Sequence, residues 1–189
     1  MNKKLRKLTF MVMFAAINYV AFAYGKINIT ITAGYSTAIH IANAVVVVSA
    51  WMLGPVYGGF AGAIGLSLAD LFDPRYITSA PKTFIMKFMI GFIAGIVADR
   101  LKLHEKTDRK DIVRTCTLSA IAGLGFNVIV DPIFGYFYKK LLLKVPAEAA
   151  SILLTWAAGV TAVNAVICVI VSVLLYLALY KSFNNIYNK

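Results

Sequence analysis

Long uncharged segments dominate the sequence. Five of them contain no Lys, Arg, Asp or Glu: 8–25, 27–69, 88–98, 115–130 and 149–180. An α-helix rises about 1.5 Å per residue, and about 20 apolar residues cross the hydrocarbon core of a bilayer. The segment 27–69 is too long for one crossing and contains a turn dipeptide, Gly54-Pro55. The pattern therefore predicts a series of membrane-spanning helices.

Six helices account for the whole pattern. The expected spans are 7–25, 38–53, 56–72, 82–99, 113–135 and 152–180, within a single membrane domain of residues 1–189. The apolar runs are too continuous for the alternating strands of a barrel wall, so the predicted fold class is all-α and no strand is expected. Composition agrees, because 60% of the residues are hydrophobic and only 14% are charged. Such a composition excludes a disordered chain and most soluble enzymes.

The distribution of basic residues predicts the orientation in the membrane. An even number of spans places both termini on one side, which carries twelve Lys and Arg, whereas the other side carries six. The positive-inside rule therefore places both termini in the cytoplasm. The net charge of +11 requires no nucleic-acid partner, because basic residues on the inner face contact anionic lipid.

Polar residues inside the expected spans indicate a binding site. Asn127 lies one helical turn from Asp131 on the same face. An ionisable residue in the membrane costs roughly 3 kcal/mol on insertion scales, so it normally faces a cavity or a partner. Other polar or amphipathic residues are expected at a similar depth, near the outer surface: His40, Asn43, Asp70, Lys87, Trp156 and Asn164. Together they predict an outward-facing pocket for a small polar molecule.

Several of these residues also have simpler interpretations. Asp70 could cap the connection to the next helix, and Lys87 could extend its ammonium toward the surface. Trp156 could belong to an interfacial aromatic belt, and His40 could bond the backbone at the start of the helix 38–53. The convergence of polar residues from five helices at one depth favours the pocket.

Motifs for other chemistry are absent from the sequence. It contains no G-x-x-x-x-G-K-[ST] phosphate loop, no H-E-x-x-H zinc motif, and only two histidines, His40 and His104. We therefore expect no ATPase site, no metal and no cofactor, and we do not expect an enzyme.

Small residues at four-residue spacing indicate close helix contacts. Gly58 and Gly62 lie one turn apart in the expected helix 56–72, and Ala15 and Ala16 lie in the first helix. Small side chains let helix backbones approach closely in lipid. They predict either packing within the bundle or a surface for another membrane subunit.

Several stretches resemble one protein family. They are IHIANAV (39–45), LGPVYGG (53–59), GAIG (62–65) with Ala69-Asp70, and PKTFIMKFMIG (81–91). They resemble the S components of energy-coupling factor (ECF) vitamin transporters. The likeness is greatest to the riboflavin-type branch, which also includes binders of pyridoxine and hydroxymethylpyrimidine. The resemblance implies a substrate-binding subunit in the bacterial plasma membrane that works with a transmembrane coupling subunit and two cytoplasmic ATPases.

The resemblance also implies a docking surface and a lid. Family members often carry Ala-x-x-x-Ala in the first helix as the contact for the coupling subunit, whereas this chain has Ala15, Tyr19 and Ala23 at that spacing. The expected contact is the small-residue side of the first three helices, around Ala15, Ala16, Gly58 and Gly62. The connection 26–37 is expected to close over the pocket.

The residues leave the vitamin open. Asp131 with Asn127 suits an amino- or hydroxymethyl-substituted heterocycle, on whose ring Tyr35 and Trp156 could stack, which favours a pyridoxine-like or hydroxymethylpyrimidine ligand. Lys87 would instead suit a carboxylate such as that of pantothenate, if Asp70 does not neutralise it.

Two other functions compete with vitamin binding. One is a small permease that acts alone, and the other is a membrane-embedded enzyme that acts on a lipid or isoprenoid. Asp70, Asp73 and Asp131 would be the acids of such an enzyme, but they lack the D-D-x-x-D spacing that holds a magnesium-bridged diphosphate.

Overall fold

The computed structural model describes residues 3–32 and 35–187. Within them lie six α-helices: α1 (Lys3–Ala23), α2 (Ala42–Leu53), α3 (Pro55–Leu71), α4 (Ala80–Arg100), α5 (Arg109–Phe137) and α6 (Ala147–Tyr187). Two strands, β1 (Lys26–Thr32) and β2 (Tyr35–His40), connect α1 to α2. Short 3-10 turns precede α4 and α5, at Ile77–Ser79 and Leu103–Glu105, and a π-helical turn, Tyr138–Leu142, follows α5. The expectation of a mostly helical protein is confirmed.

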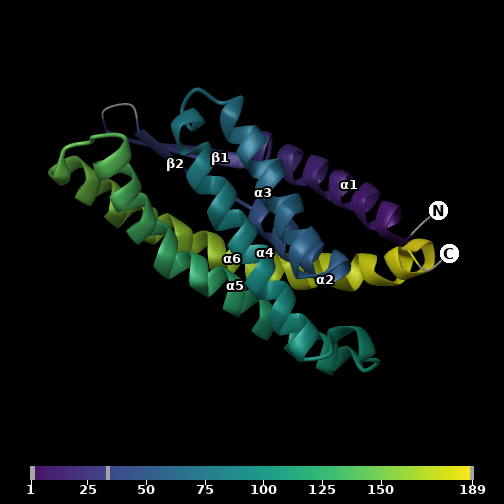
Figure 1. Cartoon of the computed structure of the whole chain (residues 1–189). Coiled ribbons are helices and arrows are strands. Elements are labelled where there is room, and N and C mark those ends of the chain that lie inside the picture. The colour runs from purple at the N-terminus through teal and green to yellow at the C-terminus, as the bar shows by residue number, and fades with distance from the viewer. Residues whose placement is uncertain (1–2, 33–34, 188–189) are drawn as a thin grey trace.

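The helices form an elongated bundle whose termini lie at the same end (Figure 1). The β-hairpin, the α3–α4 connection and the α5–α6 connection lie toward the opposite end. In the bundle, α3 packs against α1, α2 and α4, and α5 packs against α4 and α6. A common end for both termini fits an even number of crossings, and its cytoplasmic location stays a prediction from the basic residues.

The structure corrects the expectation that the helix at 38–53 is a full crossing. This helix, α2, has 12 residues, and all of them are buried. At about 1.5 Å per residue it is shorter than the roughly 30 Å hydrocarbon core. It is therefore a central helix covered by its neighbours. By length and composition, four helices in the described part of the chain could cross a membrane: Lys4–Ala23, Ile77–Arg100, Arg109–Leu142 and Ala147–Ser182.

The expectation that the chain contains no strand is wrong. β1 and β2 pair antiparallel, with Lys26 opposite His40 and Ile29 opposite Thr37. The sequence KINITIT of β1 alternates Ile with Asn or Thr, and β-branched residues in alternation favour a strand. His40 is consequently the last residue of β2 and does not open α2.

Two of the small residues pack inside the bundle. A Cβ at Gly62 would lie 2.5 Å from Cγ1 of Val46 on α2, and a Cβ at Gly58 would meet the α2 backbone at Ala50. Such distances are sterically forbidden, so α3 can approach α2 this closely only with glycine at both positions. Gly58 and Gly62 thus face α2 and not an open surface.

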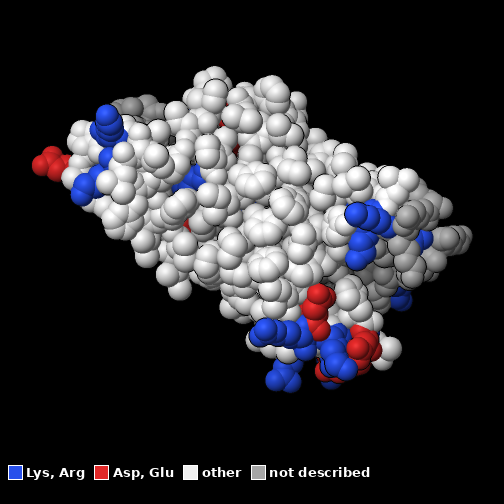
Figure 2. Space-filling view, in the orientation of Figure 1, with Lys and Arg blue, Asp and Glu red and all other residues white. Residues whose placement is uncertain are grey.

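Charged residues lie mainly at the two ends of the molecule. Figure 2 shows Lys, Arg, Asp and Glu gathered at both ends of one face, with a broad band of other residues between them. Small patches of charge interrupt this band near the end that carries the hairpin. A wide uncharged band between charged ends is the distribution expected of a protein that crosses a bilayer.

Candidate functional site: a polar cavity beside the hairpin

A polar cavity of about 110 Å³ lies between the hairpin and the helices. Its lining includes residues of all six helices and of β2. Seven of the nine residues predicted for the pocket line it: His40, Asn43, Asp70, Lys87, Asn127, Asp131 and Asn164. The structure therefore brings together most of the polar residues that the sequence analysis selected.

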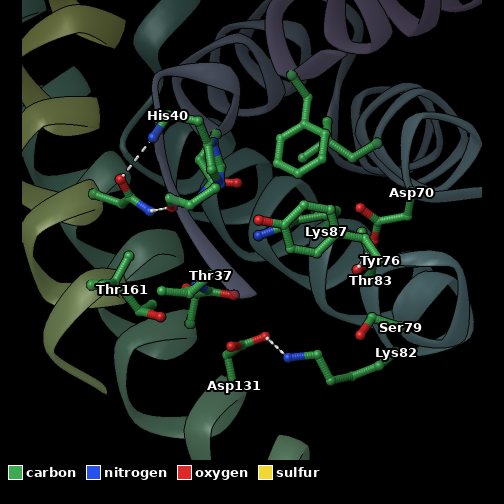
Figure 3. A pocket seen from close by; sticks show the side chains of 17 residues that line it. Thr37, His40, Asp70, Tyr76, Ser79, Lys82, Thr83, Lys87, Asp131 and Thr161 are labelled. Atoms are coloured by element: carbon green, nitrogen blue, oxygen red, sulfur yellow. Dashed lines mark hydrogen bonds and ion pairs between the residues drawn. The ribbon is translucent and has the colours of Figure 1, made fainter. Parts of the chain in front are cut away.

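Asp131 on α5 is joined to α4 by an ion pair. The Lys82 ammonium donates to Asp131 Oδ1 at 2.9 Å, and both side chains are 13% exposed (Figure 3). Asn127, one turn earlier on α5, is buried, and its Oδ1 has no hydrogen-bond partner. Lys82 was not among the predicted site residues, because it lies at the end of the expected helix 82–99. A carboxylate inside a span requires a counter-charge, which was the available signal.

Asp70 and Lys87 both line the cavity but do not form an ion pair with each other. Thr83 Oγ1 donates to Asp70 Oδ2 at 2.5 Å, which links α4 to the end of α3. Lys87 is 9% exposed and forms no hydrogen bond or ion pair with the residues that the structure describes. The condition under which Lys87 would suit a carboxylate, that Asp70 does not pair with it, is met in this geometry.

Asn164 holds the hairpin against α6. Its Oδ1 accepts from the backbone N–H of His40 at 3.0 Å, and its Nδ2 donates to the carbonyl oxygen of Ala38 at 2.9 Å. The carboxamide thus bonds β2 as a neighbouring strand would. Two further buried atoms of the lining, His40 Nδ1 and Asn43 Oδ1, have no hydrogen-bond partner among the described residues.

A second set of contacts fixes the start of the hairpin. The Lys26 ammonium lies 2.8 Å from Asp73 Oδ2, 4.2 Å from the Phe22 ring centre and 4.6 Å from the Tyr76 ring centre. The Tyr76 hydroxyl donates to Asn28 Oδ1 at 2.8 Å. These contacts tie β1 to the α3–α4 connection, beside the cavity that Phe22 and Tyr76 line.

We call the contacts of Lys26 with Asp73 and of Tyr76 with Asn28 the Asp73 latch. The ionisation of Asp73 and Tyr76 follows from their surroundings. The hydrogen bonds from Arg75 and Lys26 hold the pKa of Asp73 well below its ordinary value. Burial raises the pKa of Tyr76 to about 12. Asp73 is therefore ionised and Tyr76 neutral at physiological pH, which is the state in which both can make their contacts.

Of the two remaining predicted residues, Trp156 does not line the cavity. Trp156 is 47% exposed and lies in a shallow apolar groove on α6 with Ile39 and Val163. Tyr35 begins β2, and its side chain lies outside the described part of the structure. Residues 33–34 of the expected lid also lie outside it.

An apolar groove between α1 and α3 includes the expected docking alanines. It has a volume of about 360 Å³ and is lined by Ala15, Ala16, Tyr19, Ile64 and Leu68, among others. Ala15 is buried, whereas Ala16 is exposed. The Tyr19 ring packs edge-on against Phe72 at 6.3 Å between centres.

No metal centre is evident in the described residues. Within residues 3–32 and 35–187, no group of three or more His, Cys, Asp or Glu side chains is placed to hold a metal ion. The polar side chains of the cavity lining come from Asn, Asp, His, Lys, Ser, Thr and Tyr residues.

Comparisons with known proteins agree with this architecture. Residues 2–181 match the family model described as "ECF-type riboflavin transporter, S component". The solved structure of the S component of a bacterial ECF transporter is similar in fold, with a TM-score of 0.60 at 18% sequence identity. The match covers 94% of this chain and 97% of that one. No curated protein matches the sequence.

Proposed function

The chain belongs to the family of ECF-type riboflavin transporter S components, and from this premise we propose that it captures a water-soluble vitamin or vitamin precursor in the cavity beside the hairpin. Family membership makes the chain a substrate-binding component of a transporter and not an enzyme.

The observation that carries this proposal is the set of unpartnered polar atoms in the cavity. His40 Nδ1, Asn43 Oδ1 and Asn127 Oδ1 are buried without hydrogen bonds. Leaving a buried polar group unpaired costs about 1–3 kcal/mol, so native proteins seldom do so without a functional reason. A substrate that bonds these atoms would recover that free energy on binding.

The size of the cavity supports a small substrate. Its volume of about 110 Å³ is below the roughly 300–1,000 Å³ of pockets for drug-sized ligands. A single-ring vitamin of the size of pyridoxine or hydroxymethylpyrimidine fits this space better than a three-ring flavin. Its amino or hydroxymethyl hydrogens would bond the Asn43 and Asn127 oxygens.

Transport inward would require partners. We propose that a transmembrane coupling subunit and two cytoplasmic ATPases form the ATP-driven module, and that the complex resides in a bacterial plasma membrane. The groove lined by Ala15 and Ala16 supports an α1 contact, because close approach at small residues is a main attraction between helices in lipid. Gly58 and Gly62, which face α2, would shape this surface only indirectly.

Ligand retained during purification tests the proposed function. The protein would be purified in mild detergent, and small molecules released on denaturation would be identified by mass spectrometry. We expect a vitamin or precursor in the wild-type sample and less of it in Asn127→Ala. The control Thr155→Ala, on the outer side of α6, should retain the same amount as wild type. Accumulation against a gradient by the protein alone in liposomes would instead support a stand-alone permease.

A further inference from the structure

Lys87 is a buried lysine that forms no ion pair or hydrogen bond with the residues that the structure describes. It projects from α4 into the cavity and is 9% exposed. Figure 3 shows it between His40 and Asp70 in this view. The other lysine of the lining, Lys82, is already paired with Asp131 at 2.9 Å. Of these two lysines, Lys87 is the one whose ammonium is free to bind an acidic group of a ligand.

The nearby carboxylate does not neutralise Lys87. Asp70 Oδ2 accepts from Thr83, and neither oxygen of Asp70 lies within ion-pair distance of the Lys87 ammonium. Removing an ammonium from water is unfavourable unless an anion or several acceptors replace the water. The binding of an acidic group would supply this missing partner.

The net charge around the cavity also favours the binding of an anion. At this end of the bundle, the hairpin, the α3–α4 and α5–α6 connections and the adjoining helix ends carry seven basic and four acidic residues, a net charge of +3. They are Lys26, Arg75, Lys82, Lys87, Lys139, Lys140 and Lys144, with Asp70, Asp73, Asp131 and Glu148. A positive potential around a cleft raises the local concentration of anions.

We propose that the substrate carries an acidic group, a carboxylate or a phosphate, that forms an ion pair with the Lys87 ammonium. This rests on the proposed function and narrows it from a polar vitamin to an acidic vitamin or precursor. The Asn43 and Asn127 oxygens bond N–H or O–H groups on the rest of the molecule. Lys87 then selects the acid, and the asparagines orient the scaffold that bears it.

Matched pairs of compounds test the proposal, because each pair differs in the acidic group. The pairs are pantothenate and pantothenol, pyridoxine 5′-phosphate and pyridoxine, and flavin mononucleotide and riboflavin. Each compound would be titrated calorimetrically into the purified full chain in detergent. We expect the acidic member of at least one pair to bind at least tenfold more tightly than its neutral counterpart. The pantothenate arm distinguishes a carboxylate from a phosphate.

Two variants locate the source of the preference. Lys87→Met should bring the acidic member to within about threefold of the neutral member, because the ion pair is lost. The control Lys140→Met removes an exposed positive charge at the same end and should keep the preference. The comparison of pairs on the wild-type protein is decisive even if Lys87→Met does not fold.

Distinct outcomes separate this proposal from the proposed function. Equal or tighter binding of the neutral member in every pair, or a preference that survives Lys87→Met, overturns the acidic substrate and leaves vitamin binding intact. Binding of none of the six compounds to the wild-type protein overturns both.

Discussion

Asn164 on α6 bonds the backbone of His40 at the end of β2, with 3.0 Å between Asn164 Oδ1 and the His40 nitrogen. The same side chain bonds the Ala38 carbonyl oxygen. One buried amide therefore fixes the hairpin edge that forms a wall of the cavity. Lys26 lies opposite His40 in the hairpin and is paired with Asp73, so at this open end each strand has an attachment of its own.

Loss of the Asn164 attachment should loosen the hairpin. In Asn164→Ala, two hydrogen bonds to β2 disappear, each worth roughly 0.5–1.5 kcal/mol. We expect faster hydrogen exchange at 36–40 and weaker ligand binding, while the helices keep their protection. Ligand should slow exchange over the same residues in the wild-type protein, as expected of a lid. Exchange in Asn164→Ala equal to that in the control Thr155→Ala would contradict this role.

The Lys82–Asp131 ion pair predicts a non-additive response to mutation. Asp131→Ala removes a charged hydrogen bond and leaves the buried Lys82 ammonium unpaired, so ligand affinity should fall at least tenfold, or roughly 1.5–3 kcal/mol. In Lys82→Met/Asp131→Ala both charges of the pair are removed together, so the affinity loss should be smaller than the sum of the single losses. Titration in detergent measures the ligand affinity of the wild type, the two single variants and the double variant. Additive losses would show that the two side chains act independently.

The Asp73 latch predicts a dependence of stability on pH. The pKa of Asp73 is lowered from 3.8 by hydrogen bonds from Arg75 and Lys26, so its ionised form stabilises the folded state. Its contribution is complete at pH 7 and decreases below about pH 4, where the unfolded chain takes up the proton first. We expect Asp73→Asn to lower the Tm at pH 7, and the difference from wild type to shrink as the pH falls toward 3. A difference that is constant from pH 7 to 3 would exclude an electrostatic latch.

The sequence was sufficient for the helices and for most of the cavity. Charge-free runs of about 20 residues have few structural solutions other than membrane helices. A buried Asp131, Asn127 or Asn164 must face a polar neighbour, because lipid offers none. These two constraints act locally along the chain, so they predicted the helical fold and seven cavity residues without knowledge of tertiary contacts.

The features that were missed depend on tertiary contacts or on competing patterns. The strand β1 was overlooked because its Ile and Thr residues lie in one uncharged run with α2, although their alternation was visible. The outward position of Trp156 depends on the rotation of α6 about its axis, which its almost uniformly apolar sequence does not determine. The pairing of Lys82 with Asp131 depends on the relative axial positions of α4 and α5. Such relations are set by packing.

The last prediction concerns the coupling subunit. Ala16 is exposed beside the α1–α3 groove, and close helix approach in lipid requires small side chains at the contact. Ala16→Trp should therefore prevent complex formation with the ATPases in a pull-down and leave ligand binding unchanged, because its side chain is not part of the cavity lining. Val166→Trp, at a residue of α6 that is 65% exposed, is the matched control.

Gly62→Leu would not serve as a second test of this surface. Its side chain would collide with Val46 on α2, so loss of the complex would follow from misfolding and not from a blocked contact. A clean result needs Ala16→Trp to bind ligand as wild type does while it fails to recover the ATPases. If Ala16→Trp recovers the ATPases as well as Val166→Trp does, the coupling subunit docks elsewhere. The α1–α3 groove would then be a lipid-filled surface, because it offers almost no polar atoms to any other partner.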